Sequence, residues 1–201
     1  MHCPACRQTL HENVPACSNC GFDLAATVRV LGAAPQLEFP LTDFTGALDP
    51  AIKHNVTEAL LEMMRKFPQL RFAAVIGHVD ARIPLAAHAF WLFNLGGLSM
   101  QQESGNQCRL VLLELDMANS RAACMIGYGL EPFIPQDALD CIANAAILDL
   151  SRGNIEAAIL AALKAAQTEF TTASQSTSRA FGLPDAEQTA AAGNENAAFA
   201  Y

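Results

Sequence analysis

Apolar residues recur at helical spacing in four segments of the chain. The first begins at Asp49-Pro50, where the aspartate can cap a helix and proline suits the first helical position, and it stops before Pro68. The second runs from about Pro84 to Asn94 and ends at a pair of glycines. The other two follow each other between Leu139 and Phe170, and Asn154 is expected to cap the second of them. These patterns predict four helices.

Shorter apolar runs lie between these helices and predict strands. The run LRFAAVIGHV is typical of a buried strand, and the runs CRLVLLELD and RAACMIGYG flank the short turn MANS as a hairpin would. The order is therefore helix, strand, helix, hairpin, helix, helix. It predicts an α/β fold, a three-layer α/β/α sandwich with helices on both faces of the sheet.

The two ends of the chain differ from this central part. Residues 1–24 carry four of the seven cysteines and few large apolar side chains, which indicates a separate module. The stretch AATVRVLGAAPQLEFP shows neither helix caps nor helical periodicity, so residues 25–37 are expected to be a linker. The main domain is expected over residues 38–170. Residues 171–201 are rich in small and polar residues and are expected to be a disordered tail.

The N-terminal cysteines form two Cys-x-x-Cys pairs, Cys3 with Cys6 and Cys17 with Cys20. Four thiolates at this spacing can surround Zn²⁺ as a tetrahedron, and a module this short usually needs a metal or disulfides to fold. We therefore predict a small structural zinc ribbon with these four cysteines as its ligands. The alternatives from the residues alone are unligated cysteines or two disulfides.

Composition and charge indicate which kinds of partner and which cellular compartment to expect. The formal net charge of −8 and the lack of a basic run argue against nucleic acid binding. The N-terminal sequence has no basic and apolar signal pattern, and the longest apolar stretch is too short to cross a bilayer. We expect a cytoplasmic protein without a membrane span, in a reducing compartment where cysteines bind metal or are buried.

The central domain resembles the TPM domain, found in thylakoid acid phosphatase, photosystem repair proteins and YgcG-like bacterial proteins. The resemblance covers about residues 38–170. It rests on TDFTGALD, the helix after it, FAAVIGHV, LAAHAFWLFN, the polar loop ending in GNQ before LVLLEL, and above all GYGLE at the end of the hairpin. It implies an α/β/α sandwich, phosphatase activity in some members, and divalent cation binding, notably Ca²⁺, near loops at one end of the sheet.

This chain departs from that family at two acidic positions. It has Gly105-Asn106-Gln107 where members usually carry Asp-Asn-Gly, and Gln136 where they carry an aspartate. The carboxylates that remain as ligands of a second cation such as Ca²⁺ are Asp43, Glu103, Glu131 and Asp137. The alternative is that these are ordinary solvated residues, with Asp137 placed favourably near a helix N-terminus.

The remaining cysteines and histidines give weaker indications of a catalytic site. Cys108, Cys124 and Cys141 lie among apolar residues and are interpreted as small buried hydrophobic residues. His78 and Asp80 are close in sequence at a strand end and are a weaker candidate for a base beside an acid. The catalytic residues, if any, are not identified by these patterns.

These observations lead to one functional hypothesis and one alternative. The hypothesis is a non-catalytic adaptor or accessory protein, in which the zinc ribbon and the TPM-like domain mediate contact with a protein partner. The alternative is a weak, metal-dependent acid phosphatase that acts on phosphomonoesters, with a cation held by the carboxylates polarising a phosphoryl oxygen.

Overall fold

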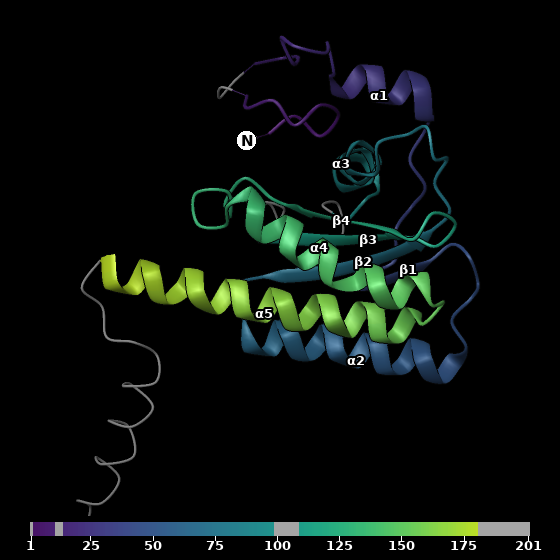
Figure 1. The fold of residues 1–201 in the computed structure, drawn as a ribbon, viewed down its shortest axis with the longest axis vertical. Coiled ribbons are helices and arrows are strands. Elements are labelled where there is room, and N and C mark those ends of the chain that lie inside the picture. The colour runs from purple at the N-terminus through teal and green to yellow at the C-terminus, as the bar shows by residue number, and fades with distance from the viewer. Residues whose placement is uncertain (1, 11–13, 99–108, 181–201) are drawn as a thin grey trace, which may run out of the picture.

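A four-stranded sheet lies between two layers of helices (Figure 1). The computed structural model describes residues 2–10, 14–98 and 109–180. The strands stand in the order β1 (Leu41–Asp43), β2 (Arg71–Gly77), β3 (Leu110–Asp116) and β4 (Arg121–Ile126). β1, β2 and β3 are parallel, and β4 returns antiparallel to β3 as the second strand of the predicted hairpin.

The helices divide unequally between the two faces of the sheet. α2 (Pro50–Lys66), α4 (Gln136–Ser151) and α5 (Ile155–Ala180) cover one face, and α3 (Leu85–Leu95) covers the other (Figure 1). α1 (Leu24–Leu31) contacts α3 on the side away from the sheet. The predicted three-layer α/β/α architecture is confirmed.

Alternation along β3 shows why the hairpin strands are so apolar. Val111, Leu113 and Leu115 belong to the core under α2, α4 and α5, whereas Leu110 and Leu112 belong to the core under α3. All seven residues of β3 are buried. A strand covered on both faces needs a continuous apolar run, and this is the pattern that the sequence shows.

The helix boundaries follow the predicted caps. Asp49 Oδ1 accepts hydrogen bonds of 2.9 Å from the backbone N–H groups of Ala51 and Ile52, at the start of α2. Asn154 Oδ1 accepts one of 3.0 Å from the N–H of Ala157, at the start of α5. Both interactions satisfy N–H groups that have no partner inside the helix.

The prediction that the stretch after residue 24 contains no helix was wrong. Asp23 caps α1 by accepting a hydrogen bond from the N–H of Ala26, and the Thr27 hydroxyl donates to the Asp23 carbonyl at 2.8 Å. The helix has only eight residues, too few for a clear periodic pattern. The segment after α1 is also fixed to the main domain, because Leu37 is fully buried and its N–H donates to the Gly96 carbonyl at 2.8 Å.

The last helix extends further than its predicted end. α5 continues to Ala180, so the first ten residues of the predicted tail are helical. Phe170 is buried, and Ala173 packs against the same core, so tertiary contact reaches one turn past the predicted boundary. The rest of the predicted tail, residues 181–201, lies outside the described residues.

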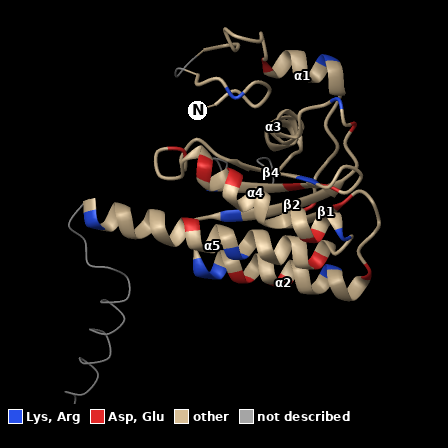
Figure 2. Ribbon diagram, in the orientation of Figure 1, with Lys and Arg blue, Asp and Glu red and all other residues tan. Residues whose placement is uncertain are grey.

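Charged side chains lie on the outer helices and also on loops and strands. Acidic and basic residues are interspersed along α2 and α5 (Figure 2). Among the described residues, no helix is both long enough and apolar enough to cross a membrane.

The close approach of residues 36–37 to the end of α3 makes Gly96 sensitive to substitution. A Cβ atom there would lie 2.5 Å from the Leu92 carbonyl oxygen and 2.6 Å from Leu37 Cδ1. We expect Gly96→Ala to destabilise the protein by about 1–3 kcal/mol in urea unfolding, because Leu37 must leave a buried site. Gly77→Ala is the control, since its Cβ meets only Phe44 at 3.9 Å. Equal effects of the two substitutions would contradict this packing argument.

Candidate metal centre

The four N-terminal cysteines lie on two turns of the same geometry. In the first, the N–H of Arg7 donates to the Cys3 carbonyl at 2.8 Å, and in the second the N–H of Gly21 donates to the Cys17 carbonyl at 2.8 Å. Arg7 and Gly21 both have a positive φ, 60° and 70°. Glycine adopts this conformation without cost, whereas arginine does so rarely, so the first turn is held by its surroundings.

These turns bring the four sulfur atoms together. The Sγ atoms of Cys3, Cys6, Cys17 and Cys20 all lie within 4.8 Å of one another. Cys3 Sγ is 3.6 Å from Cys20 Sγ, and Cys6 Sγ is 3.7 Å from Cys17 Sγ. A tetrahedral site with metal–sulfur bonds of about 2.3 Å has sulfur–sulfur edges of about 3.8 Å. The cluster therefore could hold a metal ion, as the predicted ribbon requires.

A polar side chain supports the thiolate form of one cysteine. The Asn19 side-chain amide donates a hydrogen bond to Cys6 Sγ at 3.5 Å, and this bond, the largest contribution, lowers the pKa of the Cys6 thiol to about 6. Thiolates rather than thiols bind metal ions, so Asn19 favours the ligand form of Cys6.

The cysteine module contacts the main domain on two sides. The Phe22 ring packs edge-on against Phe90 of α3, with 5.4 Å between centroids. Arg7 Nη1 lies 3.2 Å from Asp140 Oδ2 on α4. The Arg7 side chain is 74% exposed, so this ion pair contributes little energy and the aromatic contact is the stronger anchor.

Among the predicted second-cation residues that the structure describes, Asp43 lies apart from Glu131 and Asp137. Asp43 is fully engaged in the loop after β1, because its carboxylate accepts hydrogen bonds from the backbone of Thr45, Gly46 and Leu48 and from the Thr45 hydroxyl. Burial acts to raise the pKa of Asp43, but these bonds outweigh it and hold the pKa below its usual value. The Asp43 carboxylate therefore has a structural role, because it holds the loop after β1.

The strand register separates Asp43 from Glu131 and Asp137. Asp43 stands beside Ile76, which stands beside Leu115 near the end of β3. The GYGLE motif begins at the opposite end, where the N–H of Gly127 donates to the Leu110 carbonyl at 2.9 Å. β3 is about 20 Å long at 3.3 Å per residue.

The remaining acidic candidates follow the GYGLE motif. Glu131 is half-buried in that loop, and Asp137 is exposed in the first turn of α4. Glu103 lies outside the described residues. Within the described part of the chain, the four cysteines are the group that geometry brings together as metal ligands.

The GYGLE motif forms a compact turn between β4 and α4. The N–H of Leu130 donates to the Gly127 carbonyl at 2.9 Å, and the N–H of Ile134 donates to the Leu130 carbonyl at 3.0 Å. Leu130 and Ile134 are buried in the core, whereas Tyr128 is 65% exposed. The motif therefore anchors the strand-to-helix turn through its leucine.

Sequence reasoning missed two buried acids on β3. Glu114 and Asp116 are 1% and 0% exposed, and both point toward the α3 side of the sheet. Glu114 Oε1 lies 2.5 Å from Nδ1 of His88 on α3. In the sequence, the run LVLLELD has these two acids two residues apart in an otherwise apolar strand. This pattern could have indicated two acids on the same face of a buried strand.

Asp116 has a complete set of partners. Its carboxylate accepts hydrogen bonds from the Asn119 amide, from Arg121 Nε at 2.8 Å and from the N–H of Val79 at 3.2 Å. Burial would raise the pKa of Asp116, but these bonds hold it below its usual value. The network fixes the loop after β2. In that loop Asp80 binds Arg82 at 2.5 Å, an interaction other than the pairing with His78 that the sequence suggested.

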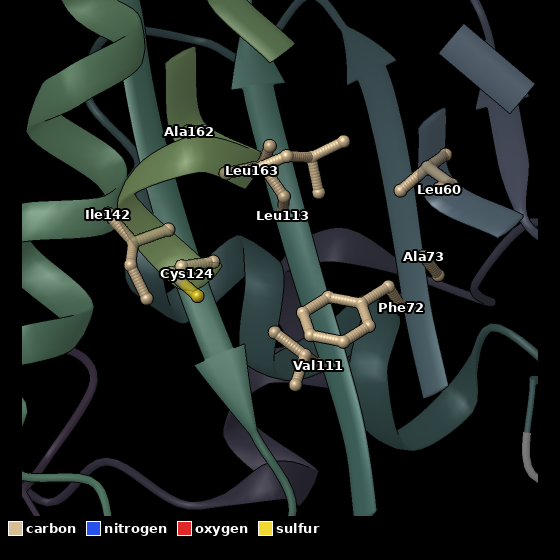
Figure 3. Close-up of a pocket in the computed structure, with 10 residues that line it drawn as sticks. Leu60, Phe72, Ala73, Val111, Leu113, Cys124, Ile142, Ala162 and Leu163 are labelled. Carbon is tan, nitrogen blue, oxygen red and sulfur yellow. The ribbon is translucent and has the colours of Figure 1, made fainter. Parts of the chain in front are cut away.

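A gap in the core of the described residues is too small for a ligand. It lies between the sheet and helices α2, α4 and α5, and Leu60, Phe72, Cys124 and Ile142 are among its lining residues (Figure 3). Its volume is about 10 Å³, close to that of one water molecule, and its lining is apolar. Burial raises the pKa of the Cys124 thiol to about 12, so Cys124 is a packing residue, as expected. The same expectation was wrong for Cys141, which is exposed on α4, and Cys108 lies outside the described residues.

The aromatic anchor gives a direct test of how the cysteine module is held. We expect Phe22→Ala to speed amide exchange in residues 14–22 by about tenfold, because an edge-on aromatic pair contributes about 0.5–1.5 kcal/mol beyond its buried area. The matched control is Phe133→Ala, since Phe133 is 49% exposed. Unchanged exchange in Phe22→Ala would mean that other contacts hold the module.

Comparison with known proteins places the main domain in a family. The model of the TPM domain (TPM_phosphatase) matches residues 41–169. No curated protein matches the chain significantly. The N-terminal domain of a protein from P. gingivalis is 21% identical, with a TM-score of 0.51, over 73% of this chain and 88% of that one. The BA42 protein of Bizionia argentinensis is 14% identical, with a TM-score of 0.53, over 65% and 86%.

The identities to these two solved structures are low, so their likeness concerns the fold alone. Both agree with a sheet that has helices on both faces. The family match spans more than half of the chain and includes the strands, α2 to α4 and most of α5. This chain belongs to the TPM domain family.

Proposed function

We propose that this chain is a non-catalytic adaptor or accessory protein, whose zinc ribbon and TPM domain together contact a protein partner. The observation that carries the proposal is the attachment of the cysteine module to the TPM domain. Phe22 anchors it to α3 and Arg7 reaches α4, so the module has a defined position on the domain. A module fixed in this way presents one constant surface to a partner.

Zinc is the metal that we assign to the cysteine cluster. Four cysteine ligands in a tetrahedral arrangement form a closed site, which suits a structural zinc ion without an open position for substrate. The ribbon has few apolar side chains, so its folding depends on the metal. The reducing cytoplasm expected from the sequence would keep the four thiols available and stays a prediction.

Metal analysis tests this assignment. We expect about one zinc per chain in purified protein, and less than a tenth of that in Cys3→Ser or Cys17→Ser, because both residues are buried ligands. Cys141→Ser is the matched control and should retain the metal, since Cys141 is exposed on α4. Absence of zinc from the unmodified protein, or another metal at full occupancy, would overturn the assignment.

The alternative function is a metal-dependent phosphatase, and the name of the matching family model, TPM_phosphatase, supports it. A hard cation such as Ca²⁺ takes six to eight oxygen ligands, several of them carboxylates. Asp43 stands at the other end of the sheet from Glu131 and Asp137, so a cation site at the GYGLE end would lack Asp43. This separation favours the adaptor.

Two assays on the same protein separate the two functions. We expect no hydrolysis of a generic phosphomonoester above background with Mg²⁺, Ca²⁺ or Mn²⁺, and no rise in melting temperature with millimolar Ca²⁺. We also expect partners captured from the native host to be lost on Cys3→Ser but kept on Cys141→Ser. Turnover that a chelator and Asp137→Asn or Glu131→Gln abolish would instead establish the phosphatase.

A further inference from the structure

A buried acid lies under the helix that carries the cysteine module. Glu114 is in the middle of β3, paired in register with Val75 of β2 and Ala123 of β4. Its side chain is 1% exposed and faces α3. An ionised carboxylate in such a place needs several hydrogen bonds or an ion pair to offset the loss of water.

Glu114 has one close partner. His88 Nδ1 on α3 lies 2.5 Å from Glu114 Oε1, while Oε2 is buried and accepts no hydrogen bond from the described residues. A buried oxygen without a hydrogen bond raises the free energy of an ionised carboxylate strongly. The cost is much smaller when that oxygen is the carbonyl oxygen of a neutral carboxylic acid. The geometry fits a protonated Glu114 whose Oε1–H donates to Nδ1 of His88.

The charged groups around Glu114 agree with this protonation state. Asp116 is on the same strand, two residues away, and disfavours a second negative charge. Arg121 of β4 is positive, but its guanidinium already binds Asp116, with Nη2 2.7 Å from Oδ2. On the same face, β2 offers Arg71, Ala73, Val75 and Gly77. Arg71 lies at the start of the strand beside Leu110, with its guanidinium over the Phe39 ring. The ionisable groups that act on Glu114 are therefore His88, Asp116 and Arg121.

The pair sits where it can control the outer layer of the molecule. The His88 ring packs against Trp91, with 5.1 Å between centroids, and Trp91 Nε1 donates to the Gly32 carbonyl just after α1 at 3.2 Å. On its outer side, α3 holds Phe22 through Phe90. The same short helix thus links the sheet to both α1 and the cysteine module.

We propose that Glu114 and His88 form a proton-dependent latch, which holds α3 and the cysteine module against the sheet while Glu114 is protonated and loosens when Glu114 ionises. The ligand of this site is the proton itself. The latch does not depend on the proposed adaptor role, because it concerns only how α3 is held.

The direction of the pH effect follows from the burial. Burial is the largest influence on Glu114 and raises its pKa above the ordinary value of 4.5, against the opposing effect of His88. Between 4.5 and the raised pKa, the folded chain keeps a proton that the unfolded chain has released. Stability from this group is therefore fully present below about 4.5 and is lost as the pH rises through that window.

Thermal melting across pH tests the latch. Glu114→Gln keeps the shape and polarity of the neutral acid but cannot ionise. We expect the melting temperature of the unmodified protein to fall relative to Glu114→Gln by roughly 3–5 °C per pH unit inside the window. Glu62→Gln, an exposed glutamate on α2, is the matched control and should follow the unmodified protein. Parallel profiles of the unmodified protein and Glu114→Gln would overturn the proposal.

Trp91 gives a local readout of the same event, because it is the single tryptophan of the chain. Its emission should change with pH in the unmodified protein and in Glu62→Gln, with the same midpoint as the loss of stability, and stay constant over that range in Glu114→Gln. Amide exchange in residues 85–95 should rise over the same range. Emission that titrates equally in all three proteins would contradict the latch.

A measurement on the unmodified protein covers the case in which Glu114→Gln does not fold. With ¹³C-labelled glutamate, the midpoint at which the Glu114 carboxyl carbon changes its chemical shift should lie above the ordinary value of 4.5. A midpoint at or below 4.5 would refute the latch.

Discussion

Burial of β3 on both faces is the constraint on which the rest of the structure depends. The strand lies between β2 and β4, with three helices on one face and α3 on the other. Every polar group on it must therefore find a partner inside the protein. Asp116 does so through Asn119 and Arg121, and this network fixes the loop after β2. Within the described residues Glu114 Oε1 meets His88 while Oε2 accepts no hydrogen bond, which is the basis of the proposed proton dependence.

α3 is buried on two sides, which accounts for its unusual sequence. One side packs on the sheet through residues such as Leu92, and the other receives Phe22 and α1. A helix with apolar residues all round is expected when it is covered all round. The cysteine module is therefore part of the packing of the TPM domain. A metal ion held by the four cysteines would therefore also stabilise the contact that covers the outer side of α3.

The antiparallel return of β4 decides which residues can act together. It carries the GYGLE motif and the start of α4 to one end of the sheet, while the parallel strands β1, β2 and β3 deliver Asp43, Gly77 and Asp116 to the other. Acidic residues that look like one ligand set in the sequence are thus divided by the length of a strand. Any chemistry at the GYGLE end has to use residues of that end alone.

The sequence by itself determined the four clustered cysteines, the caps at Asp49 and Asn154, and the three-layer order of elements, because each depends on spacing between near neighbours in the chain. It missed α1, whose eight residues are too few for a periodic signal. Only the tertiary structure decided that His88 meets Glu114 and that Asp43 stands apart from Glu131. Those relations depend on strand register and on which helix covers which face, and residues 26 or more positions apart carry no local pattern that fixes either.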